Sequence, residues 1–121
     1  MNDKPINLVQ KSDFDKEVGL LIKKYREAHN LTQEVFSEKI GISLKYISRF
    51  ENGYSGIKQQ TLINTMNLLG ISPNMIYEKF ITNEEISKQI QLSHKLQSLS
   101  GEKLDLAISI LDLLIDKEQN T

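Results

Sequence analysis

The chain of 121 residues has no cysteine and no tryptophan, only two prolines, and no long uninterrupted apolar run. The absence of cysteine excludes disulfides, thiolate metal sites and cysteine nucleophiles. Two well-separated histidines do not suit a His-rich metal site, so we expect neither a metal nor another cofactor. No apolar stretch approaches the roughly 18 residues that a membrane helix needs, and the first residues lack a signal-peptide pattern. The sequence therefore predicts a soluble cytoplasmic protein without membrane contact.

The net charge is also small. Fifteen Lys and Arg stand against sixteen Asp and Glu, which gives a formal net charge of -1, so the chain does not coat nucleic acid by bulk charge. The charges are unevenly spread, because residues 17–80 have eight basic and six acidic side chains, whereas residues 81–121 have four and seven. This difference indicates separate roles for the two parts, but charge alone does not point to DNA.

What the sequence does contain is helical periodicity. From residue 13 to residue 80, apolar side chains recur at steps of three and four, and no period-2 strand is found. Residues 1–12 lack this period and are predicted to form a flexible arm. The expected N-caps are Asp13, Thr32, Ser43 and Ser72, and the expected stops are Gly41, Asn52-Gly53 and Gly70. We therefore predict an all-α domain of five helices over residues 13–80, with a loop over residues 54–60.

Residues 81–121 are predicted to add one or two helices. Thr82 and Glu85 have the spacing of a capping box, and Ser100-Gly101 interrupts the helical pattern. Residues 104–115 then contain nine apolar side chains in twelve, placed all round the helix. This part is expected to be a C-terminal helical dimerisation segment.

Residues 32–53, TQEVFSEKIGISLKYISRFENG, predict two short helices joined by a turn that contains Gly41. The second helix is polar on its outer side, which allows a helix to enter the major groove of DNA. With Arg26 upstream and TLINTMNLLGIS downstream, this stretch closely resembles the repressor/Cro-like, Xre-type helix-turn-helix family over roughly residues 14–80. The resemblance implies a lambda-repressor-like DNA-binding domain in a transcriptional regulator, expected here to be a repressor of a double-stranded DNA operator.

The outer side of the second helix supplies the candidates for reading bases. Because Ile47 and Phe50 must face inward, four other side chains of this helix point outward. They are Leu44, Lys45, Ser48 and Arg49. Arg49 suits a bidentate contact to guanine, and Leu44 suits a thymine methyl. The alternative for Arg49 is an ordinary solvated surface charge.

The phosphate candidates lie on both sides of this helix. Gln33 resembles the family's phosphate-clamping glutamine at the start of the preceding helix, where backbone amides also favour an anion. The other candidates are Tyr46, Asn52, Ser55 and Lys58. Asn52 is equally well explained as a helix stop, and Lys58 as an exposed loop lysine. The resemblance also implies that Glu51 pairs with Arg26, which makes both residues structural.

Three departures from the family pattern affect the neighbourhood of these residues. Ser37 stands where a small alanine is usual, and we expect its hydroxyl to bond a carbonyl one turn back. Residues 54–60 lack the usual proline, and Gln59 replaces a common apolar residue. The path of this loop is therefore the least predictable part of the domain.

No enzyme is expected, because the sequence shows neither a nucleophile with an orienting partner nor a Gly-rich phosphate loop. The main alternative is a protein-interaction module of the antitoxin or anti-repressor type, with the same fold but no sequence-specific DNA reading.

The last helix carries the prediction of a homodimer. One stripe of apolar side chains suffices for packing within the chain. Its six members are Leu104, Ala107, Ile108, Leu111, Leu114 and Ile115. Three further apolar side chains, Leu106, Ile110 and Leu113, fall outside this stripe and are predicted to form a dimer interface. The homodimer is expected to bind a pseudo-palindromic operator. Two alternatives remain open: these residues cover the preceding helix of the same chain, or the C-terminal helices bind a peptide or protein modulator.

Overall fold

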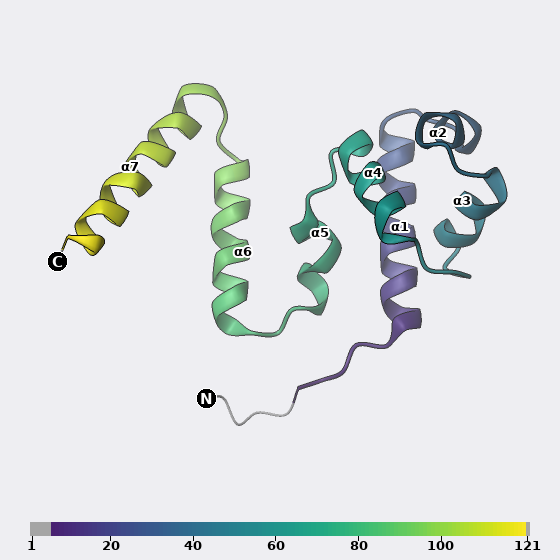
Figure 1. The fold of residues 1–121 in the computed structure, drawn as a ribbon, viewed down its shortest axis with the longest axis horizontal. Helices are drawn as coiled ribbons and strands as arrows, with labels where there is room; N and C mark the ends of the chain where they lie inside the picture. Colours follow the sequence, from purple (N-terminus) through teal and green to yellow (C-terminus); the bar gives the residue numbers. More distant parts are fainter. Residues whose placement is uncertain (1–5, 121) are drawn as a thin grey trace. The chain divides into compact units, whose positions relative to one another are not determined.

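The computed structural model describes residues 6–120, and every regular element in that range is helical. The elements, in order, are α1 (Lys11–Ala28), α2 (Gln33–Ile40), α3 (Leu44–Glu51), α4 (Gln59–Leu69), α5 (Pro73–Tyr77), η1 (Glu78–Phe80), α6 (Glu84–Gln97) and α7 (Gly101–Gln119) (Figure 1). The prediction of an all-α fold is confirmed. The chain divides into two compact units, of which the first ends at Phe80 and the second begins at Ile81.

Most helix ends of the first unit lie where the local sequence predicts them. The side chains of Thr32, Ser43 and Ser72 each accept a hydrogen bond from the backbone N–H three residues later. Gly41 and Gly70 end α2 and α4 with φ angles of 67° and 71°, in the left-handed region that favours glycine. These caps and stops are local features, which is why the sequence alone predicts them.

Helix α1 begins earlier than predicted. Its N-cap residue is Gln10, whose carbonyl accepts a hydrogen bond from the N–H of Asp13, so the predicted cap Asp13 lies within the first turn. Lys11 Nζ donates to Asp15 Oδ2 at 2.6 Å, and such an i, i+4 ion pair favours the added helical residues. The last two residues of the predicted arm are therefore helical, and its first five lie outside the described residues.

Two further boundaries also differ from the prediction. Helix α4 begins at Gln59, so the loop predicted over residues 54–60 ends earlier. Helix α6 is capped by Asn83, whose Oδ1 accepts from the N–H of Ile86 at 3.1 Å, and not by Thr82. Asn and Thr are both good N-caps, so the sequence does not distinguish between the two neighbours.

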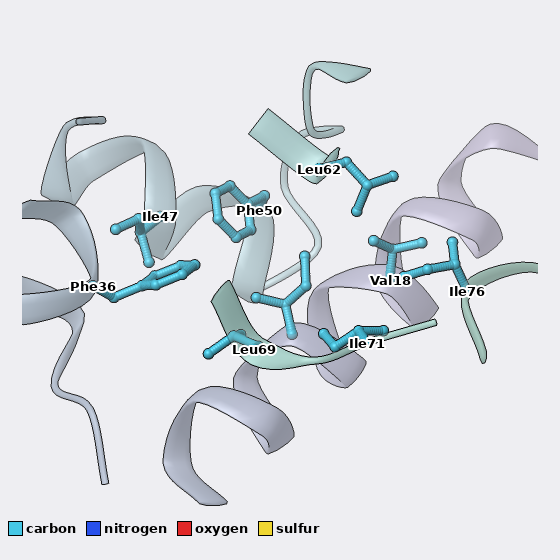
Figure 2. Packing of buried hydrophobic residues seen from close by; sticks show 9 residues of the cluster. Val18, Phe36, Ile47, Phe50, Leu62, Leu69, Ile71 and Ile76 are labelled. Carbon is cyan, nitrogen blue, oxygen red and sulfur yellow. The ribbon is translucent and has the colours of Figure 1, made fainter. Parts of the chain in front are cut away.

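An apolar core holds the helices of the first unit together. Its buried members are Val18, Ile22, Phe36, Ile47, Phe50, Leu62, Leu69, Ile71 and Ile76 (Figure 2). Ile47 and Phe50 project into this core from one side of α3. The core therefore fixes which side of α3 faces outward.

Gly19 sets how closely α1 approaches α3. A Cβ atom on Gly19 would lie 2.0 Å from the carbonyl oxygen of Phe50 and 3.3 Å from the Cα of Glu51. Because any side chain would meet backbone atoms there, only glycine allows the end of α3 to rest on α1. Sequence reasoning missed this residue, since a glycine inside a helix gives no local sign of what lies opposite.

We expect Gly19→Ala to lower the free energy of unfolding by about 1–3 kcal/mol, because the added methyl group forces the backbones apart. Helix propensity alone would raise stability by up to about 1 kcal/mol, so the sign of the change is diagnostic. Urea denaturation followed by circular dichroism measures it. Lys24→Ala, at an exposed position of the same helix, is the control and should change stability by no more than about 0.5 kcal/mol. A Gly19→Ala variant as stable as the parent would contradict the close approach.

In the second unit, neither α6 nor α7 has a buried residue. Leu106, Ile110 and Leu113 are 61%, 49% and 63% exposed. Three members of the stripe predicted to pack within the chain are exposed as well: Ile108, Leu114 and Ile115. Burial of apolar side chains is the main source of stability for a short helix in water. The second unit by itself thus leaves the apolar surface of α7 largely uncovered.

Candidate nucleic-acid interface

Helices α2 and α3 are joined by a short turn over residues 41–43. The hydroxyl of Ser37 donates a hydrogen bond to the carbonyl of Ile42 within this turn. The predicted bond from Ser37 to a carbonyl one turn back is therefore wrong, because closing the turn uses the hydroxyl instead. This bond and the left-handed Gly41 hold the two helices at a defined angle.

The outer side of α3 presents the predicted base-reading residues unequally. Lys45 and Arg49 are exposed, and Leu44 is 43% exposed. Ser48 is less accessible because it is half-buried, and its carbonyl accepts a hydrogen bond from Asn52 Nδ2 at 2.8 Å. Two cations and one apolar side chain therefore form the accessible surface of a helix whose other side is anchored in the core.

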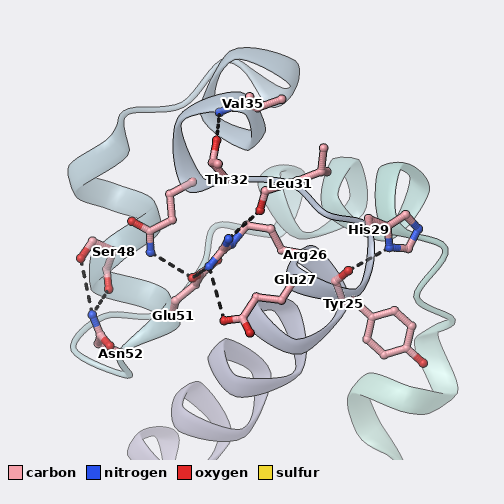
Figure 3. Close-up of polar contacts among 11 residues, drawn as sticks. Tyr25, Arg26, Glu27, His29, Leu31, Thr32, Val35, Ser48, Glu51 and Asn52 are labelled. Carbon is pink, nitrogen blue, oxygen red and sulfur yellow. Dashed lines mark hydrogen bonds and ion pairs between the residues drawn. The ribbon is translucent and has the colours of Figure 1, made fainter.

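Arg26 and Glu51 join α1 to the last residue of α3. Arg26 Nε donates to Glu51 Oε2 at 2.8 Å, and Nη2 donates to Oε1 at 2.9 Å. The two side chains are 9% and 1% exposed. Figure 3 shows the planar guanidinium facing the carboxylate. Two parallel charge-assisted hydrogen bonds fix both distance and orientation, so this pair determines where α3 ends relative to α1.

Two neighbours complete the environment of this pair. Arg26 Nη1 donates to the carbonyl of Leu31 at 2.7 Å, and Gln33 Nε2 donates to Glu51 Oε1 at 3.1 Å. The side-chain hydrogen bond to Glu51 raises the pKa of Arg26 above its ordinary value. A raised pKa means that the stabilisation by the charged form is complete at every pH below the ordinary value. The guanidinium is therefore charged throughout the physiological range.

Gln33 lies at the first position of α2, beside this network. Its amide nitrogen is bonded to Glu51, which fixes the side chain, and a second N–H on the same nitrogen is left over for another acceptor. Thr32 caps the N–H of Val35, so the earlier amides of this turn have no partner within the helix. This helix start thus offers several donors for an anion.

Tyr46 connects α3 to the loop that follows it. Its hydroxyl accepts a hydrogen bond from the backbone N–H of Lys58 at 2.7 Å, and its ring meets Phe50 edge-on at 5.2 Å. The hydroxyl proton is not used in this bond and is available to an outside acceptor. Sequence reasoning missed the structural role of Tyr46, because its partner is a backbone atom twelve residues away. Lys58 itself is exposed.

Two other predicted phosphate ligands are placed less favourably. Asn52 is exposed, but its amide nitrogen is bonded to Ser48, one turn back on the helix. This bond to the last turn of α3 agrees with the alternative role of Asn52, which is to end the helix. The side-chain oxygen of Ser55 is buried and has no hydrogen-bond partner among the described residues, so it does not face outward. The loop therefore offers Tyr46 and Lys58 to an anion in preference to these two.

The double-mutant cycle of Arg26→Met and Glu51→Leu tests the buried pair. Each single change leaves the partner's charge buried without its counterion, so each should lower stability by about 3–5 kcal/mol. The free energy of unfolding of the double variant should fall by less than the sum of the two single losses, as measured by urea denaturation. Lys79→Met and Glu17→Leu, at an exposed pair 2.8 Å apart, give the control cycle, in which coupling should be much smaller. Additive losses at Arg26 and Glu51 would show that the pair contributes no coupling.

Other kinds of site are not indicated in the described part of the chain. Over residues 6–120, no group of three or more His, Cys, Asp or Glu side chains is arranged to hold a metal ion. Nor is any helix in this range both long and apolar enough to cross a membrane.

Comparison with known proteins agrees with the geometry of α2 and α3. Residues 22–76 match the model of the Helix-turn-helix family, a stretch that begins within α1 and ends within α5. A comparison with curated protein sequences finds no match. The chain therefore carries a helix-turn-helix domain of the repressor/Xre kind, the DNA-binding domain of a transcription regulator.

Proposed function

We propose that this Xre-type regulator is a repressor that binds a pseudo-palindromic operator as a homodimer, with α3 in the major groove. The observation that carries the proposal is the division of α3 into a buried side, Ile47 and Phe50, and an accessible side with Lys45 and Arg49. A helix held in this way presents its outer side chains at fixed positions, which base reading requires. The cytoplasmic location that the sequence predicts is part of this proposal.

Arg49 is the leading candidate for reading a base. Its guanidinium can bind O6 and N7 of guanine together, and a good bidentate contact provides about 1–3 kcal/mol of discrimination. Lys45 reaches guanine or a phosphate, and Leu44 suits the methyl group of thymine. Ser48, which is half-buried, takes a smaller part.

Phosphate contacts orient α3 within the groove. The start of α2 with Gln33 supplies amide donors on one side, and Tyr46 with Lys58 supplies a phenol and a cation on the other. Such contacts position the protein but carry no direct sequence information. In this proposal Asn52 and Ser55 shape the end of α3 and its loop more than they bind the backbone.

A matched pair of variants distinguishes base reading from phosphate binding. Arg49→Ala should relax the preference at one base position at a cost of about 1–3 kcal/mol, whereas Gln33→Ala should weaken binding to all sequences to a similar extent. The readout is selection from random duplexes by the full chain, followed by titration of the selected sites. Lys24→Ala, on α1 beside Met75, is the control and should leave both preference and affinity unchanged. An Arg49→Ala variant with an unchanged site preference would show that another residue reads the base.

The alternative function is a protein-interaction module of the antitoxin or anti-repressor type. It predicts no duplex affinity at any salt concentration. A DNA-binding protein instead loses affinity steeply as salt rises, because binding releases counterions from the phosphates. The same titrations therefore separate the two functions.

The proposed dimer rests on the apolar surface of α7. Leu106, Ile110 and Leu113 are about half exposed or more, although burying each is worth roughly 1.5–3 kcal/mol. A two-fold pairing in which each chain contributes its α7 covers these side chains on both copies. Two recognition helices about 34 Å apart then read successive major grooves, which one helix alone does not achieve.

We expect the double variant Leu106→Lys, Leu113→Lys to sediment as a monomer at micromolar concentration, at which the parent chain is a dimer. The affinity for the operator should fall as well, since a monomer binds only one half-site at a time. Gln119→Lys adds one lysine, against two in the double variant, at an exposed position of the same helix and should remain dimeric. A monomeric parent chain would instead point to a peptide or protein modulator as the occupant of this surface.

A further inference from the structure

The first half of α1 runs beside the loop that connects α3 to α4, and two of its lysines lie against glycines of that loop. A Cβ atom on Gly53 would lie 2.7 Å from Lys16 Cγ. One on Gly56 would lie 3.2 Å from Lys11 Nζ. The two lysine side chains therefore follow the same loop backbone that leads to the proposed phosphate contact of Lys58.

Both lysines keep their charged ends accessible. The side chain of Lys11 is 81% exposed, whereas that of its partner Asp15 is only 12% exposed and lies against Gly56. The ion pair with Asp15 thus keeps Lys11 beside the loop, and it uses one of the three N–H donors of the Lys11 ammonium group. The other two remain for an acceptor in solvent.

Lys16 is also exposed and lies where two hollows meet. It lines one hollow with Lys23, Asn52 and Gly53 at the end of α3. On its other side it lines a hollow with Asp13 and Glu17. Glu17 is bonded to Lys79 at 2.8 Å, which offsets its charge. The surface of α1 that borders the loop therefore presents an accessible ammonium group at Lys16 as well as at Lys11.

We propose that Lys11 and Lys16 bind the phosphates of the DNA strand that the loop follows, so that α1 is part of the interface. The inference rests on the proposed function and extends it to α1, for which the sequence predicts only structural roles, such as that of Arg26. An ammonium group is a flexible point charge with three donors, which suits a phosphate and carries no base preference. At Gly53 a side chain would force Lys16 to shift, because its Cβ would lie 2.7 Å from Lys16 Cγ.

The dependence of affinity on salt tests this assignment. Each phosphate contact contributes about 0.9 to the slope of log affinity against log salt concentration on duplex DNA. Lys11→Ala and Lys16→Ala should each lower the steepness by about 0.9, and the double variant by about 1.8, with unchanged base preference. The measurement is a fluorescence anisotropy titration of the full chain, at several salt concentrations, with a duplex selected by the parent protein.

Three further variants keep the test specific. Lys24→Ala removes a lysine from another side of α1 and should leave the slope unchanged. Lys11→Arg keeps the charge and should keep the slope. Asp15→Asn removes the ion pair but not the cation, so a slope as steep as that of the parent supports phosphate binding. A loss equal to that of Lys11→Ala would instead show that only the ion pair matters, and would overturn the assignment of Lys11.

The inference and the proposed function fail in different ways. A parent chain that binds no duplex at low salt contradicts the proposed function. A parent chain that binds with a steep salt dependence, together with a folded double variant that has the same slope, contradicts only the role of the two lysines. Circular dichroism melts of each variant establish that it is folded.

Discussion

A buried arginine that meets a buried glutamate at two hydrogen-bonding atoms each is the constraint on which the rest of the first unit depends. Arg26 and Glu51 join the last turn of α1 to the last residue of α3. Neither charge is tolerated in the interior without the other, so the pair allows one relative position of the two helices. The outward direction of α3 follows from that position.

The surroundings of the pair reinforce the same geometry. At Gly19 the backbones of α1 and α3 approach too closely for any side chain. Gln33 connects the carboxylate of Glu51 to the start of α2, and Tyr46 connects α3 to the following loop. Two of the residues proposed to contact phosphate, Gln33 and Tyr46, therefore also hold α3 in place. A contact to DNA at either of them acts on a helix that is already held in place.

The sequence predicts the parts of this fold that depend on neighbouring residues. Thr32 and Ser43 cap helices, and Gly41 ends one, because each acts within a few residues of its own position. The pairing of Arg26 with Glu51 spans 25 residues and was available only through the family resemblance. Local pattern gives no indication of contacts at such a distance.

The same limit explains what the sequence missed at the candidate interface. Gly19 looks like an ordinary weak point of a helix until the backbone of α3 is placed beside it. The side-chain oxygen of Ser55 is buried, although its position in a polar loop suggested exposure. Helix α1 begins at Lys11, two residues before the predicted cap Asp13, and the ion pair of Lys11 with Asp15 lies in this added turn. In each case the deciding atom belongs to another part of the chain, or to a side chain whose rotamer the sequence does not specify.

Helices α6 and α7 differ from helices α1 to α5 because no residue in either is buried. Helices without a core are stabilised mainly by association with a partner, so the fraction that is folded depends on the concentration of that partner. If a second copy supplies the missing core, the concentration of dimer grows with the square of the free chain concentration at low levels. Operator occupancy then rises more steeply than the amount of protein in the cell. A small change in synthesis or degradation would thereby become a large change in transcription, without any small-molecule signal.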